Sequence, residues 1–195
     1  TQIPGQYNIA TASRQPGSSI KPIVYAAAFV QGYTPETVLF DVPTQFSTRC
    51  DAYGNPLGSA RESDCYMPEN YDGAFRGPMT LRDALAQSIN VPAVKLLYLT
   101  GLKNAVATSQ AMGLSTITDA SRYGLSFVLG GGEVTLLELT NAYGVFANNG
   151  VYNKPQGILE VRDADDTILE KYTPQQTDAL PETVTSLISS VLSDN

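Results

Sequence analysis

The apolar residues of the chain recur mostly at intervals of three and four, which predicts a mainly helical protein. An apolar run from 20 to 30 predicts the first helix. Two capping-box patterns, Thr80-Leu-Arg-Asp83 and Thr135-Leu-Leu-Glu138, each predict a helix start, because a threonine hydroxyl and an acid three residues later can bond each other's backbone N–H groups. Further helices are expected after Asn90, from Leu102 to Met112 and from Pro181 onwards.

Two short runs near the C-terminal end have the pattern of strands instead. They are Gly157–Arg162 and Thr167–Tyr172, and the tetrapeptide Asp163–Asp166 between them predicts a hairpin turn. The segment 34–78 has neither period, so we expect it to be irregular, with residues 41–78 forming an excursion from the helical body. The pattern as a whole predicts a mainly α protein with a small β-hairpin.

The composition fits a folded protein of one domain or at most two small ones. The chain has 195 residues, of which 43% are hydrophobic and 16% charged, so it can form a packed core. Its formal net charge of −7 makes it a poor candidate for binding nucleic acid or an anionic membrane surface, because both attract clustered Lys and Arg. No apolar stretch approaches the roughly 18 to 20 residues that cross a bilayer.

The absence of histidine restricts the possible chemistry more than any other feature of the composition. With 0 histidines, the chain cannot form a Ser-His-Asp triad, a Cys-His dyad or a metal site that needs an imidazole. If the protein performs nucleophilic chemistry, its general base must therefore be a lysine or a carboxylate.

The cysteines are Cys50 and Cys65, and both lie in a polar stretch from 47 to 69. In an oxidising compartment they could form a disulfide that stabilises the fold by about 3 kcal/mol, which would agree with an extracytoplasmic location. The alternative is two unrelated thiols. Two cysteines without histidine form a zinc site only if carboxylates join them, so we expect no metal.

The segment Arg14-Gln-Pro-Gly-Ser-Ser-Ile-Lys-Pro22 carries the first candidate chemistry. Pro16 and Gly17 break the chain, so Ser18 lies at a turn that enters the apolar helix, where free backbone N–H groups favour an alkoxide. Lys21 follows three residues later, on the same face, and an amine shielded from water can lose its proton and act as a base. The alternative is that Ser18 or Ser19 only caps the helix.

The second candidate is Ser88-Ile89-Asn90, at the joint between two predicted helices. Such a joint can direct Ser88 and Asn90 into a cleft while Ile89 points to the core. A serine hydroxyl can relay a proton, and an asparagine amide can bind a peptide carbonyl. The alternative is that both polar residues only end one helix and cap the next.

Three segments together resemble the penicillin-binding proteins, most closely the bifunctional class A enzymes. The first is RQPGSSIKP with the following IVYAAA, which resembles the active-site segment of that family. The second is PENYDGAFRGPMTLRDALAQSINVPAVKLL, in which Ser88-Ile89-Asn90 matches the Ser-x-Asn motif. The third is GLSFVLGGGEVTLLELTNAYGVFANNGVY. The resemblance covers nearly the whole chain.

The resemblance implies a D,D-transpeptidase that cross-links peptidoglycan stem peptides ending in D-Ala-D-Ala and is acylated by β-lactams. It implies that Ser18 is the nucleophile, Lys21 the base that takes its proton, Ser88 the relay to the leaving amine, and Asn90 the residue that positions the substrate. Neither a metal nor an organic cofactor is needed. The parent protein would be anchored to the membrane, with this domain on the extracytoplasmic face of the bacterial cell membrane and the chain itself not anchored.

Two other functions remain open. One is a non-catalytic module that senses β-lactams or binds peptidoglycan, in which Ser18 is acylated without turnover. The other is a serine β-lactamase, an enzyme class that uses the same Ser-x-x-Lys motif but often has Asp where this chain has Ile89.

The third motif of the family, Lys-Thr-Gly, is absent from the chain. The sequence, which begins with Thr1, is therefore expected to be a partial transpeptidase domain over 1–195, lacking the N-terminal strands and the Lys-Thr-Gly strand. The resemblance implies the helical part of the α/β fold shared with serine β-lactamases, with most of the sheet missing. We expect apolar surface to be exposed where that sheet belongs, and the isolated chain to be inactive or nearly so.

Overall fold

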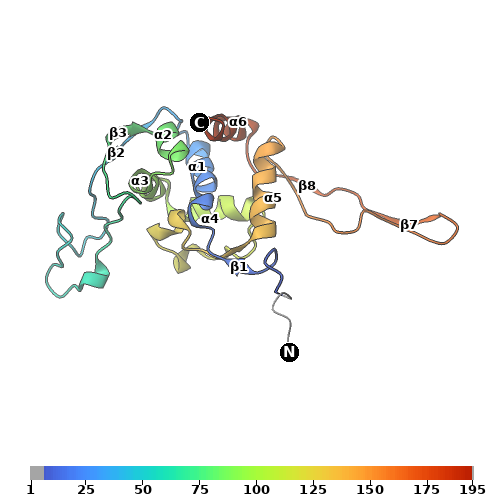
Figure 1. Cartoon of the computed structure of the whole chain (residues 1–195), viewed down its shortest axis with the longest axis horizontal. Helices are drawn as coiled ribbons and strands as arrows, with labels where there is room; N and C mark the ends of the chain where they lie inside the picture. Colours follow the sequence, from blue (N-terminus) through green and yellow to red (C-terminus); the bar gives the residue numbers. More distant parts are fainter. Residues whose placement is uncertain (1–6, 195) are drawn as a thin grey trace.

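A computed structural model of the chain describes residues 7–194. A body of packed helices carries two long extensions, a loop excursion on one side and a hairpin on the other (Figure 1). The helices are α1 Lys21–Val30, α2 Leu81–Ala86, α3 Asn90–Thr100, α4 Leu102–Ala111, α5 Leu136–Ala147 and α6 Glu182–Leu192. Their order and type agree with the sequence prediction, and their ends differ from it by one or two residues.

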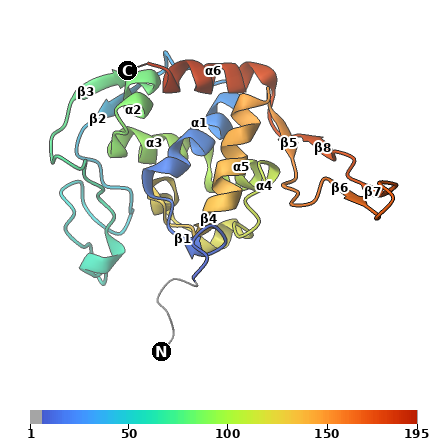
Figure 2. The ribbon, with the colours of Figure 1, turned by 45° about the vertical axis from the view of Figure 1, so that its right-hand side comes forward.

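Helix α1 is the centre of the body, and α3, α4 and α6 pack around it (Figure 2). Every residue from Ile20 to Phe29 is buried. A helix that is apolar on all sides must be enclosed on all sides, and here the chain's own helices enclose it. The body is thus more self-contained than we expected of a domain that lacks most of its sheet. Apolar residues are exposed at the end of α1, at Val30, and on α5, at Leu136 and Leu137.

Both predicted capping boxes form only in part. The Thr80 hydroxyl accepts a hydrogen bond from the Asp83 N–H, and the Thr135 hydroxyl accepts one from the Glu138 N–H, each at 3.1 Å. The acidic side chains do not return the bond to the backbone as predicted. The Asp83 carboxylate accepts from the Thr80 hydroxyl at 2.6 Å, and the Glu138 carboxylate accepts from Ser115.

The strands form only two-stranded antiparallel sheets within residues 7–194. The predicted hairpin is present as β6 Glu160–Arg162 and β7 Ile168–Lys171. The other pairs are β1 Ser13–Arg14 with β4 Val134–Thr135, β2 Val38–Asp41 with β3 Gly77–Thr80, and β5 Val151–Asn153 with β8 Gln176–Asp178.

The pairing of β2 with β3 corrects the prediction that 34–78 is wholly irregular. These strands hold together the two ends of that segment, so the excursion leaves the body and returns to it at one place. The sequence signal was weak because β2 has only four residues and β3 begins with Gly77-Pro78, two residues that disfavour strands.

The excursion is closed by a disulfide between Cys50 and Cys65, whose Cα atoms are 5.6 Å apart. Beside it, the Arg49 guanidinium lies 3.2 Å from the Asp64 carboxylate, and the rings of Phe46 and Tyr66 are 6.1 Å apart. These contacts make the excursion an ordered loop that has little regular secondary structure of its own.

Within the same described residues, every helix is too short or too polar to span a membrane.

Loss of the disulfide should destabilise the chain. In the chain-entropy model, a bond that closes a loop of about 15 residues stabilises the folded state by about 3 kcal/mol, because it restricts the unfolded chain. We expect the double variant Cys50→Ser/Cys65→Ser to lose about that much free energy of unfolding, measured by urea denaturation. Reductant should have the same effect on the unmodified chain and none on the double variant. An unchanged unfolding midpoint would contradict the prediction.

Candidate active site

Ser18 lies in a 3₁₀ turn, Gly17–Ile20, that runs directly into α1. Gly17 permits this turn because its φ is +59°, a value that residues with a side chain rarely adopt. The Ser19 hydroxyl donates to the Pro16 carbonyl at 2.5 Å, and the Tyr143 hydroxyl donates to the Ser19 carbonyl at 2.9 Å. Ser19 therefore holds the turn together and leaves Ser18 exposed.

The Ser18 hydroxyl makes no hydrogen bond to any residue of 7–194, and no side chain caps either the turn or α1. The helix-cap alternative for this serine therefore has no support in the geometry. An exposed hydroxyl at the entrance of a helix, with its own turn held by a neighbour, is placed to meet a ligand.

Lys21 is the first residue of α1, and its side chain is buried, with 1% of the residue exposed. Its ammonium donates to the Ser88 carbonyl at 2.6 Å, to the Ser88 hydroxyl at 3.2 Å and to Asn90 Oδ1 at 2.8 Å. Ser88 and Asn90 lie 67 and 69 positions from Lys21 in the sequence, and both bond to its amine.

The joint between α2 and α3 presents Ser88 and Asn90 to that amine. Ser88 has a φ of +56°, which is uncommon for a residue with a side chain and turns the chain sharply between the helices. Ile89 is buried against Met79 and Ala84, so it anchors the joint to the body as the sequence predicted. The polar residues on either side of it therefore face away from the core.

Of the four predicted site residues, the structure joins three by hydrogen bonds and leaves one apart. Lys21, Ser88 and Asn90 are bonded together, but the direct bond between Ser18 and Lys21 that the spacing suggested is not formed. The reason is that Ser88 and Asn90 supply three oxygen acceptors, which satisfy all three N–H donors of the ammonium.

Burial lowers the pKa of Lys21 to about 8, because the charged amine loses its hydration in the body of the protein. About half of the molecules would then carry a neutral amine at pH 8, and about a tenth at pH 7. A neutral Lys21 has a lone pair and can accept a proton, which an ordinary exposed lysine cannot do near neutral pH.

A glycine-rich segment packs against the Ser18 turn. Gly130, with φ +99°, follows the 3₁₀ turn Leu125–Leu129, and a Cβ atom at this position would lie 2.4 Å from the Gly17 nitrogen. Only glycine allows the two backbones to approach so closely. The sequence motifs did not predict this role, although the run Gly130-Gly131-Gly132 is a signal for close backbone packing.

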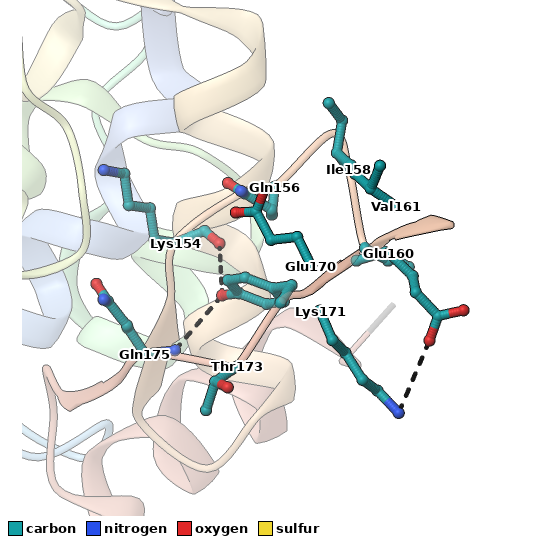
Figure 3. A pocket seen from close by; sticks show the side chains of 11 residues that line it. Lys154, Gln156, Ile158, Glu160, Val161, Glu170, Lys171, Thr173 and Gln175 are labelled. Carbon is teal, nitrogen blue, oxygen red and sulfur yellow. Dashed lines mark hydrogen bonds and ion pairs between the residues drawn. The ribbon is translucent and has the colours of Figure 1, made fainter. Parts of the chain in front are cut away.

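A separate pocket of about 440 Å³ lies at the hairpin, far along the chain from Ser18 (Figure 3). Its wall includes Tyr172, whose hydroxyl donates to the Lys154 carbonyl at 3.5 Å. It also includes the partly buried Glu160 and the exposed Lys171, whose carboxylate oxygen and amine nitrogen are 3.9 Å apart. Nothing in it pairs a nucleophile with a base, so the buried lysine and not this pocket marks the candidate active site.

The family model for the penicillin-binding protein transpeptidase domain matches residues 4–193. The chain belongs to this family. The chain is 38% identical over 178 residues to penicillin-binding protein 1A of Aquifex aeolicus, and that match covers 91% of the chain and 22% of the relative. The chain therefore spans about a fifth of this transpeptidase relative.

Solved structures of the transpeptidase family share the fold. Penicillin-binding protein 1A of Haemophilus influenzae aligns with a TM-score of 0.81 and 25% identity, over 96% of this chain and 31% of that one. Penicillin-binding protein A of M. tuberculosis, solved as an imipenem acyl-enzyme complex, aligns with a TM-score of 0.76 and 22% identity, over 95% of this chain and 44% of that one. The present fold is the helical portion of the transpeptidase fold with small two-stranded sheets, which confirms the predicted fold class.

Replacing Gly130 with alanine should displace the Ser18 turn. The new methyl group would overlap the Gly17 backbone, and overpacking of this kind typically costs about 1–3 kcal/mol. We expect Gly130→Ala to shift the backbone amide resonances of residues 17–19 and to lower the free energy of unfolding. Gly32→Ala is the matched control, because Gly32 also has positive φ, +96°, but a Cβ there meets nothing within 4 Å. Equal losses in both variants would show that strain, not overlap, is responsible.

The Lys21 amine should titrate near pH 8 in the folded chain. We expect the ¹³Cε resonance of Lys21, assigned by its loss in Lys21→Met, to move with a midpoint near pH 8, well below the 10.5 of an unperturbed lysine. The unfolded chain keeps this proton to about pH 10.5, so it binds more protons between pH 8 and 10.5. The free energy of unfolding should therefore rise with pH in that window, relative to Lys21→Met. A midpoint near 10.5 would contradict the burial described here.

Proposed function

We propose that this chain is the part of a serine D,D-transpeptidase that carries the nucleophile, the base and the proton relay for cross-linking peptidoglycan. The observation that carries the proposal is the buried Lys21 amine bonded to Ser88 and Asn90, with the exposed hydroxyl of Ser18 three residues before it. A chain without histidine needs such an amine to activate a serine.

In the proposed reaction, neutral Lys21 removes the proton from Ser18 as its oxygen attacks the carbonyl carbon of the penultimate D-Ala. The backbone N–H of Ser18 donates to the oxyanion that forms. The proton then passes from Lys21 through the Ser88 hydroxyl to the nitrogen of the leaving D-Ala, and the C–N bond breaks. The resulting ester on Ser18 is attacked by an amine of a second stem peptide, which restores the serine and forms the cross-link.

Asn90 is proposed to position the donor peptide through its amide. In the structure that amide is already engaged, since Nδ2 donates to the Glu69 carbonyl at 3.0 Å and Oδ1 accepts from Lys21. A substrate that bonds to this amide would replace one of these two bonds. Where it replaces the bond from Lys21, substrate binding would free the Lys21 amine from Asn90.

The same site would form an ester with a β-lactam, whose strained amide stands in for the peptide bond. The proposed location is the extracytoplasmic face of the bacterial cell membrane, which is consistent with the disulfide between Cys50 and Cys65. The peptidoglycan stem peptide is the proposed partner.

We further propose that the chain alone reacts slowly or not at all. The direct contact between Ser18 and Lys21 is absent, and a misplacement of about 1 Å can lower a rate about 100-fold. A second oxyanion donor, if it comes from residues outside this chain, would contribute another factor of about 10² to 10³.

A labelled penicillin tests both parts of the proposal. Intact-mass measurement should show little or no adduct on the 195-residue chain after minutes, and any adduct should disappear in Ser18→Ala. Ser59→Ala is the control, since Ser59 is an exposed serine in the part of the excursion that the disulfide closes. Rapid stoichiometric acylation would contradict the inactivity of the chain. Failure of a longer protein containing this chain to be acylated at Ser18 would contradict the proposed function itself.

A further inference from the structure

Asn70 is a buried polar residue outside the predicted site, at the point where the excursion returns to the body. It is 6% exposed. Its Oδ1 accepts hydrogen bonds from the backbone N–H groups of Asn90 and Val91, at 3.0 and 3.1 Å. These are the first two residues of α3, whose N–H groups have no partner within the helix. Asn70 thus holds the start of the helix that carries Asn90.

The orientation of the Asn70 amide is fixed from its other side. Its Nδ2 donates to both oxygens of the Asp41 carboxylate, at 2.7 and 2.9 Å, and to the Ala74 carbonyl at 2.7 Å. Asp41 is fully buried, at 0% exposure, so its charge must be compensated by its neighbours. A carboxylate accepts and cannot donate, so it holds the NH₂ group of Asn70 towards itself and the oxygen towards α3.

Asp41 is held in turn by Arg76. The Arg76 backbone N–H donates to Asp41 at 3.0 Å, and its guanidinium lies 3.8 Å from the same carboxylate. The buried charge is therefore fixed at the end of β2, on a strand pair that belongs to the body.

On the far side of Asn70, the contacts continue to the candidate base. The backbone of Asn90 is bonded to Asn70, and its side chain accepts from Lys21 at 2.8 Å. The Asn90 amide also donates to Glu69, the residue before Asn70. A continuous set of hydrogen bonds thus runs from Arg76 through Asp41, Asn70 and Asn90 to Lys21.

We propose that Asn70 is a positioning residue for the transpeptidase site: oriented by the buried Asp41 carboxylate, it holds the start of α3 so that Asn90 keeps the Lys21 amine in place. The hydrogen bonds of Lys21 go to Ser88 and Asn90 and not to Asn70 itself. That this role serves catalysis rests on the proposed function. That Asn70 places the Lys21 amine does not depend on the proposed function.

The first test replaces Asn70 with leucine, which has a similar size but no hydrogen-bonding group. First-turn amides of a helix normally exchange fast, so slow exchange at Asn90 and Val91 in the unmodified chain would report the Asn70 bonds. We expect Asn70→Leu to accelerate exchange at both amides about 10- to 100-fold. We also expect the titration midpoint of Lys21 to rise by about one unit, as water reaches the amine.

Asn55→Leu is the matched control. Asn55 also donates its Nδ2 to an aspartate, Asp51, at 2.9 Å, but this pair is exposed in the excursion. The control should change neither the exchange at Asn90 and Val91 nor the Lys21 midpoint. If Asn70→Leu leaves the two amides unchanged, the proposal is overturned. If the amides exchange faster but the Lys21 midpoint does not move, Asn70 only caps α3, and the proposal is again overturned.

A second pair of variants applies if Asn70→Leu does not fold. Asn70→Asp alone places two carboxylates against each other and should lower the thermal midpoint and the protection of Asn90 and Val91. Adding Asp41→Asn should restore most of that protection, because the amide introduced at position 41 can donate to the carboxylate introduced at position 70, which still accepts from α3. Protection no better in the double variant than in Asn70→Asp would refute the role of the Asp41 carboxylate.

These measurements require no penicillin and no substrate. If the chain and a longer protein containing it prove unreactive while the amide exchange and the Lys21 titration behave as expected, the proposed function fails and the placement of the amine stands. If acylation at Ser18 occurs in the longer protein but Asn70→Leu leaves both readouts unchanged, only the role of Asn70 fails.

Discussion

The arrangement of the site depends on keeping one amine, that of Lys21, away from water while oxygens from a distant joint hold it. The burial comes from the position of Lys21 at the start of a helix that the body encloses on all sides. The oxygens come from the sharp turn at Ser88 and from the start of α3. If either element moved, the amine would regain its hydration and behave like an ordinary lysine.

Contacts from other parts of the molecule keep the start of α1 and the joint between α2 and α3 in place. Ile89 fixes the joint between α2 and α3 from the core side, and Asn70 bonds it from the side of the excursion. The close approach of Gly130 to Gly17 does the same for the Ser18 turn. The long irregular segment is therefore part of the site's support, although none of its residues was predicted to belong to the site.

Much of the fold and of the candidate site could be predicted from the sequence, because the signals for them are local. The helices followed from spacing, caps and glycines, and the residue pairs Ser18 with Lys21 and Ser88 with Asn90 followed from motifs of three and four residues. What could not be predicted depends on pairing between segments far apart in the chain. Strand β2 meets its partner β3 only across the whole excursion, and Asn70 meets α3 only because the excursion returns to the body there. The bonds of Lys21 to Ser88 and Asn90, instead of to Ser18, likewise follow from tertiary packing, which residue spacing alone does not reveal.

The disulfide divides the excursion into two parts with different mechanical roles. The residues between Cys50 and Cys65 are closed off by a covalent bond, whereas those from 66 to 76 lead to the contacts around Asn70 and Asp41. The tip around Tyr53, which is 86% exposed, is thus insulated from the site. Extra residues inserted at that tip would lengthen a closed loop at little entropic cost and leave the candidate active site undisturbed, so this is where a reporter or affinity handle could be grafted.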